Sequence, residues 1–166
     1  MPIDPINTLV YRRARFATRL PVDRRYSASH FWLLEVAPSR WRIGFTKFAT
    51  RMLGDLVELN FSLVDGDPIV LGQPMGTIEG FKAVADLYGV ASGVFVGGNA
   101  AVYNDPTLVD SDPYDRGWLY EIDGVPDPGA VSAQDYAVRL DTIIDQLLQR
   151  TNFQAGDDTC SQQNMS

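Results

Sequence analysis

Hydrophobic and polar residues alternate over short stretches through most of the chain, a pattern typical of β-strands. The alternation is clearest at Val57, Leu59 and Phe61, which have polar neighbours. Short apolar runs bounded by Gly, Pro, Asp or Asn predict further strands. These strands are expected near residues 31–34, 41–43, 69–71, 77–80, 84–90, 92–96 and 118–122. The Asp65–Pro68 stretch is predicted to be a turn.

Two segments instead repeat their apolar residues at helical spacing. A short helix is predicted from Thr46, with Phe48, Met52 and Leu53 on one face and Gly54 as its stop. A long helix is predicted to open at Ser132. The apolar stripe of the long helix, which we expect to face the core, comprises Tyr136, Leu140, Ile143, Ile144, Leu147 and Leu148. Many short strands with few helices predict a mainly β fold, a small barrel or sandwich with helical decoration.

The two ends of the chain differ from this central domain, residues 26–150. Residues 1–25 form a basic N-terminal extension, which we expect to pack on the domain with residues 9–20 partly helical. An Arg-rich, acid-poor start is also typical of a mitochondrial transit peptide, but the prolines and Asp4 disfavour that alternative. Residues 151–166 are polar and unpatterned, which predicts a disordered tail.

The net charge of −7 conceals an asymmetry. Residues 1–25 hold six arginines and two acids, a sum of +4, whereas the rest holds eight basic residues and 19 acids, a sum of −11. An acidic body repels phosphates and argues against nucleic acid as a partner. No apolar run approaches the ~20 residues of a membrane helix, so membrane insertion is not expected.

Catalytic and metal-binding constellations are absent from the sequence. The single histidine, His30, stands beside aromatic residues in a predicted buried strand, where a structural role is favoured over a catalytic one. The single cysteine, Cys160, excludes an intrachain disulfide and a cysteine zinc site, and we expect it to be an exposed thiol without function. The sequence therefore predicts a protein that is not itself an enzyme.

Lysine is scarce, and Lys82 is one of only two, with Lys47. It follows Gly80 near the centre of a predicted strand–turn–strand unit, where a turn would present it clear of the body. On local grounds alone it would be an ordinary surface lysine, flanked by the carboxylates of Glu79 and Asp86.

The wider context of Lys82 resembles the H protein of the glycine cleavage system and, more broadly, the lipoyl domains. The similarity runs over residues 26–148. The matching segments are Leu53-Gly54-Asp55, the Gly66 turn, Ile78-Glu79-Gly80-Phe81-Lys82-Ala83, Asp86-Leu87-Tyr88, Ser92-Gly93, Asn99, Asp105-Pro106, Asp112-Pro113-Tyr114, Gly117-Trp118-Leu119 and the terminal helix. Biotin carriers share this fold but usually flank the lysine with methionine, unlike Phe81 and Ala83.

This resemblance implies a barrel-sandwich hybrid of two small antiparallel sheets, with lipoic acid in amide linkage on Lys82. It also implies two sets of site residues. Recognition of the hairpin by a lipoate ligase or another lipoylation enzyme would use Glu79, Gly80, Phe81 and Ala83. The cleft around the loaded arm would comprise Ser29, His30, Phe31 and Asp86. Such a carrier supplies reach and shelter and needs no acid or base of its own.

One position departs from the family pattern. Glycine-cleavage H proteins usually carry a glutamate where Phe31 stands, and that glutamate helps to hold the amine of the aminomethyl-loaded arm. With the basic extension and residues 45–50, this departure resembles the H-like lipoate-binding proteins of sulfur-oxidising prokaryotes. The resemblance implies a carrier of sulfur-bound intermediates in the prokaryotic cytoplasm, working with a heterodisulfide-reductase-like complex.

Two alternatives remain open. The first is a glycine-cleavage H protein with a variant cleft, working with the glycine cleavage enzymes. The second is an unlipoylated H-like interaction protein. A place in the mitochondrial matrix is the less favoured location.

Overall fold

The computed structural model describes the backbone of residues 7–165 and the side chains of residues 7–150. Its elements, in chain order, are β1 (Thr8–Arg13), β2 (Phe16–Pro21), β3 (Arg25–Tyr26), β4 (Phe31–Ala37), β5 (Arg40–Phe45), α1 (Lys47–Leu53), β6 (Leu56–Phe61), β7 (Pro68–Ile69), β8 (Pro74–Gly80), β9 (Val84–Tyr88), β10 (Ala91–Gly98), α2 (Ala100–Asn104), α3 (Leu108–Ser111), β11 (Tyr120–Pro126) and α4 (Ala133–Met165). The expected mainly β class is confirmed.

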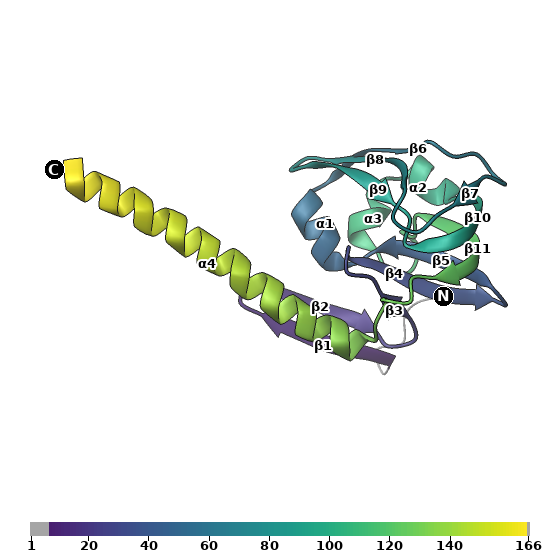
Figure 1. The fold of residues 1–166 in the computed structure, drawn as a ribbon, viewed down its shortest axis with the longest axis horizontal. Helices are drawn as coiled ribbons and strands as arrows, with labels where there is room; N and C mark the ends of the chain where they lie inside the picture. The colour runs from purple at the N-terminus through teal and green to yellow at the C-terminus, as the bar shows by residue number, and fades with distance from the viewer. Residues whose placement is uncertain (1–6, 166) are drawn as a thin grey trace.

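Two antiparallel sheets form the body (Figure 1). One has six strands in the order β3-β4-β5-β11-β10-β7, and the other has three in the order β6-β8-β9. The main hydrophobic core lies between them and includes Leu33, Ile43, Ile78, Leu87 and Ile122. Together these sheets are the barrel-sandwich architecture that the sequence predicts, with α1 near one end (Figure 1).

The first half of β4 is apolar at successive positions because both of its faces are covered there. Phe31 and Leu33 face the core between the sheets, whereas Trp32 belongs to a second cluster on the opposite face. The Trp32 indole is fully buried, and its Nε1 donates a hydrogen bond to the Pro113 carbonyl at 2.9 Å. A strand buried on both sides gives a continuous apolar run rather than alternation.

The second cluster joins the N-terminal extension to α4. The expectation of partial helix over residues 9–20 is wrong, because β1 and β2 form an antiparallel hairpin with Leu9 opposite Leu20. Alternate side chains of the hairpin, including buried Tyr11 and Leu20, pack against the apolar stripe of α4. At the rim, Arg13 makes two hydrogen bonds to Asp145, at 2.8 and 2.7 Å. The extension therefore packs on the domain as a small sheet.

Helix α4 leaves the body and projects beyond the hairpin (Figure 1). Its stripe faces inward at Tyr136, Leu140 and Ile144, but Leu148 is exposed. Against the expectation of a disordered tail from residue 151, the backbone stays helical to Met165. No proline interrupts these turns, and extending an existing helix adds a hydrogen bond per residue without a new nucleation cost. Cys160 lies where side chains are not described. Within the described part of the chain, no helix is long and apolar enough to span a membrane.

Leu20→Ala should destabilise the protein, which tests whether the hairpin is part of the folded domain. Leu20 is fully buried between β2 and α4, so we expect a loss of about 2–4 kcal/mol in the free energy of unfolding. The matched control is Val10→Ala in the same hairpin, because Val10 is 65% exposed. Guanidinium unfolding of both variants measures the difference, and equal stabilities would contradict the packing described above.

Candidate functional site: the Lys82 hairpin

Lys82 occupies the turn between β8 and β9, as the sequence predicts. The Gly80 amide donates to the Ala83 carbonyl at 2.8 Å and closes the turn. The Lys82 side chain is exposed, and the Phe81 ring beside it is 84% exposed. This turn presents an amine and an aromatic ring outside the hydrophobic core.

Backbone hydrogen bonds fix the turn to the junction between α1 and β6. The Lys82 amide donates to the Leu53 carbonyl at 2.9 Å, and the Phe81 amide donates to the Asp55 carbonyl at 2.8 Å. Gly54 ends α1 with φ +78°, a left-handed conformation that favours glycine. A Cβ on Gly80 would lie 2.2 Å from the Leu53 oxygen, so only glycine allows this approach. The turn is therefore held against the end of α1 by main-chain contacts.

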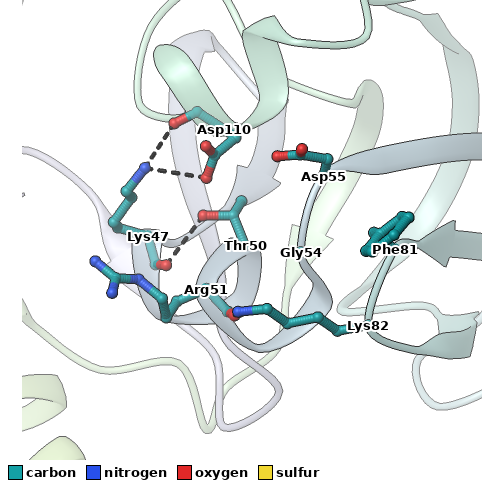
Figure 2. A pocket seen from close by; sticks show the side chains of 8 residues that line it. All are labelled: Lys47, Thr50, Arg51, Gly54, Asp55, Phe81, Lys82 and Asp110. Atoms are coloured by element: carbon teal, nitrogen blue, oxygen red, sulfur yellow. Dashed lines mark hydrogen bonds and ion pairs between the residues drawn. The ribbon is translucent and has the colours of Figure 1, made fainter.

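A polar cavity of about 290 Å³ lies on one side of the α1 terminus (Figure 2). The Lys82 Nζ extends toward it and donates to the Arg51 carbonyl at 3.3 Å. Across the cavity, the Lys47 Nζ contacts Asp110, with 3.0 Å to Oδ1. Burial acts to raise the pKa of Asp110, but the hydrogen bond and charge of Lys47 outweigh it, and the pKa lies below its ordinary value. Lys47 is thus held in an ion pair, whereas Lys82 makes no ion pair with a carboxylate among the described residues.

An apolar cleft of about 230 Å³ lies on the other side of the α1 terminus. Three of the four predicted cleft residues, Ser29, Phe31 and Asp86, line it together with Ala83 from the hairpin. Phe31 is buried and stacks on Phe45 with ring centroids 4.8 Å apart. The cleft begins at the lysine turn and has mostly hydrocarbon walls, which suit the methylene chain of a lipoyl arm.

His30 does not line this cleft. Its Nδ1 lies 2.8 Å from the Tyr136 hydroxyl, and its ring packs on Phe48 at 4.7 Å. Burial lowers the pKa of His30 to about 4, so the imidazole is neutral near pH 7. His30 lies in the turn before β4 and not in the predicted buried strand: its φ is +70°, and its amide donates to the Ser27 carbonyl at 3.1 Å. His30 therefore has the structural role that its aromatic neighbours predict. It does not line the cleft to which the family resemblance assigns it.

Two features of the site could not be found by looking for reactive side chains. The Leu53 and Arg51 carbonyls, which anchor the hairpin and the Lys82 amine, are main-chain groups. In the sequence, only the Leu53 carbonyl is marked, through the Leu53-Gly54-Asp55 match to the lipoyl proteins. Within the described residues there is no cluster of metal-ligating side chains.

Comparisons with known proteins identify the family. The glycine cleavage H-protein family model matches residues 24–135. The chain belongs to the glycine cleavage H-protein family. It is 33% identical over 128 residues to the glycine cleavage system H protein of Mycobacteroides abscessus. The aligned region covers 77% of this chain and 92% of that protein. It is 37% identical over 117 residues to the Streptomyces coelicolor glycine cleavage system H protein, and that match covers 70% of this chain and 93% of that protein.

A solved structure agrees with these sequences. The crystal structure of a glycine cleavage system H protein from Mycobacterium marinum superimposes with a TM-score of 0.65 at 35% identity. The match covers 72% of this chain and 98% of that one. Glycine cleavage H proteins carry a lipoate covalently on a lysine and act as carriers.

The relatives favour one of the sequence-based alternatives. The sulfur-oxidation subfamily and its heterodisulfide-reductase-like partner find no support among them, and the glycine-cleavage alternative fits better. These relatives are bacterial proteins.

Proposed function

We propose that this chain is the lipoyl carrier of a glycine cleavage system, with lipoate linked as an amide to the Lys82 Nζ. One observation carries the proposal. In a family that bears lipoate on a lysine, Lys82 is exposed at a tight turn beside an apolar cleft. The only other lysine, Lys47, is held by Asp110. Its modification would break that ion pair.

The residues around Lys82 fit the arm. The lipoyl dithiolane would supply the sulfur atom that carries an aminomethyl group from glycine. The Arg51 carbonyl, which accepts from the Lys82 amine, can also accept from an amide N–H at that nitrogen. The apolar cleft walls exclude water from a chain lying along them, and Asp86 is the acidic residue in their lining. Asp86 is therefore the residue we assign to the amine of the cargo.

Partners follow from this role. Lipoylation enzymes would recognise Glu79, Gly80, Phe81 and Ala83, of which Phe81 and Glu79 are exposed and Ala83 lines the cleft. The glycine cleavage enzymes would load and unload the arm. The chain itself acts as a non-catalytic subunit.

Phe31 is the observation that favours the second candidate, a carrier for sulfur oxidation. Its ring occupies a cleft position where a carboxylate would balance the charge of an amine. In the glycine-cleavage assignment, Asp86 alone supplies that negative charge.

Aminomethyl loading of the lipoylated protein by a glycine decarboxylase tests the proposal, with intact mass as the readout. We expect efficient loading of the natural protein. Phe31→Glu, compared with Phe31→Leu as a control for the lost ring stacking, should then change loading little. A gain of about tenfold or more from Phe31→Glu, the worth of one charge-assisted hydrogen bond, would favour the sulfur carrier instead.

A further inference from the structure

Helix α1 lies between the arm cleft and the N-terminal hairpin. The α1 residues that line the apolar cleft are Ala49, Met52 and Leu53. Two other α1 side chains, Phe48 and Arg51, contact the ring of the hairpin residue Phe16. We propose that Phe16 is a positioning residue for the lipoylation of Lys82, which rests on the proposed function, and that it acts by holding the last turn of α1 in place.

The Phe16 ring joins the hairpin to both turns of α1. It is buried, and its centroid lies 5.6 Å from that of Phe48 in an edge-to-face contact at 89°. The Arg51 guanidinium lies over the same ring, 6.0 Å from its centroid, at the outer limit of a cation–π contact. Phe48 belongs to the first turn of the helix and Arg51 to the last. Through one side chain, the hairpin therefore supports the whole length of α1.

Polar groups anchor the start of α1 to the body. The Thr46 hydroxyl accepts from the Ala49 amide and lies 2.9 Å from the Tyr136 hydroxyl. The Lys47 amide donates to the Tyr114 hydroxyl at 2.9 Å. These contacts fix the first turn. A helix of seven residues is too short to be stable alone, so the position of its last turn depends on side-chain packing.

The last turn of α1 carries the two carbonyls that hold the lysine turn. The Lys82 amide donates to the Leu53 carbonyl, and the Lys82 Nζ donates to the Arg51 carbonyl. Leu53 packs into the main core, whereas the Arg51 side chain extends to Phe16. Without the Phe16 ring, the last turn loses its support on the hairpin side. Because Lys82 bonds to that turn, a movement of the turn also displaces the lysine.

Phe16 lies outside the region that the family model matches, which begins at residue 24. The hairpin therefore adds to α1 a support that the matched region does not contain. This contact gives the N-terminal extension a role at the attachment site, in addition to its packing on α4.

Hydrogen exchange of the unmodified, ¹⁵N-labelled full chain tests the contact without lipoate. In Phe16→Ala, the exposed Lys82 turn should open more often, and its amide should exchange at least about fivefold faster than in the natural protein. Leu20→Ala is the matched control, because it removes a buried side chain from the same strand about 13 Å farther along. Exchange at Lys82 should stay within about twofold of the natural rate in this control.

The rate of lipoyl transfer by a lipoate ligase, followed by intact mass on the same proteins, connects the contact to modification. Phe16→Ala should lower kcat/KM at least about threefold relative to Leu20→Ala, because the amine is displaced from its position. Phe16→Leu keeps a buried apolar side chain but lacks the ring, so it should fold and lie between the natural protein and Phe16→Ala in both measurements.

Two results would overturn the proposed role of Phe16. One is Lys82 exchange in the Phe16 variants that is no faster than in Leu20→Ala, since the hairpin would then act only through general stability. The other is an unchanged rate of lipoyl transfer in a folded Phe16 variant whose Lys82 amide exchanges faster. Absence of lipoyl mass on the natural protein is a different outcome, which would overturn the proposed function and this inference with it.

Discussion

Lys82→Arg should abolish lipoylation while leaving the fold intact. The substitution keeps the positive charge and the exposed position at the turn, but a guanidinium is not the amine that an acylating enzyme needs. We expect the variant to gain no lipoyl mass after incubation with a lipoate ligase, lipoate and ATP, whereas the natural protein gains one lipoyl group. Intact-mass spectrometry measures both.

Lys47→Arg is the matched control for that result. An arginine can keep the contact with Asp110, so this variant should be lipoylated as the natural protein is. Thermal unfolding should be the same for both variants to within about 0.5 kcal/mol, as for most surface substitutions. Lipoyl mass on Lys82→Arg, or its loss from Lys47→Arg, would move the attachment site to Lys47.

Gly80→Ala should both destabilise the protein and slow its lipoylation. The added Cβ would meet the Leu53 carbonyl oxygen at 2.2 Å, so the turn must move away from the end of α1. Because the Lys82 amide bonds to that same oxygen, the movement also displaces the lysine. We expect a loss of about 1–3 kcal/mol, as overpacking typically costs, with a lipoylation rate reduced along with it.

Gly129→Ala separates this effect from the general cost of replacing a glycine. Its new Cβ would contact only the flexible side chain of Asp127, at 3.2 Å. Denaturant unfolding and the initial rate of lipoyl transfer should therefore be nearly normal. A Gly80→Ala protein that matched this control in both measurements would show that the close approach to Leu53 is not needed.

The fold was largely predictable because its strands have readable patterns. The run from Phe31 to Leu34 predicts a buried strand, and the first three residues of β4 are buried, with side chains on both faces of the sheet. Thr46 and Gly54 mark the ends of α1 by their capping chemistry, and the Thr46 side chain does accept from the Ala49 amide. These signals depend only on residues close in sequence, so they can be recognised without knowledge of the tertiary structure.

The N-terminal hairpin could not be read in the same way. Its six-residue strands are rich in arginine, and Arg13 lies on the same side as Tyr11, where alternation predicts an apolar residue. Only the presence of Asp141 and Asp145 on α4 makes an arginine suitable there. Since that pairing spans most of the chain, local sequence patterns could not reveal it.

The candidate site divides along similar lines. Lys82 is recognisable because the family motif surrounds it, and the family resemblance is also what assigns Phe31 to a cleft, whose lining Phe31 joins. His30 is adjacent in sequence but faces Tyr136, because it lies in the turn before β4 with φ +70° and not in the strand itself. The Arg51 carbonyl lies beyond any motif, since every residue carries one.

The hairpin and α4 pack together outside the region that the family model matches. The family match ends at residue 135, one residue before Tyr136, whose ring stacks on Tyr26 with centroids 4.8 Å apart. A protein trimmed to residues 24–135 would lose that ring, Leu20 and Leu140, and would expose Tyr26 and Trp32 to water. The bounds of the family model are therefore not the bounds at which this chain can be cut without opening a hydrophobic cluster.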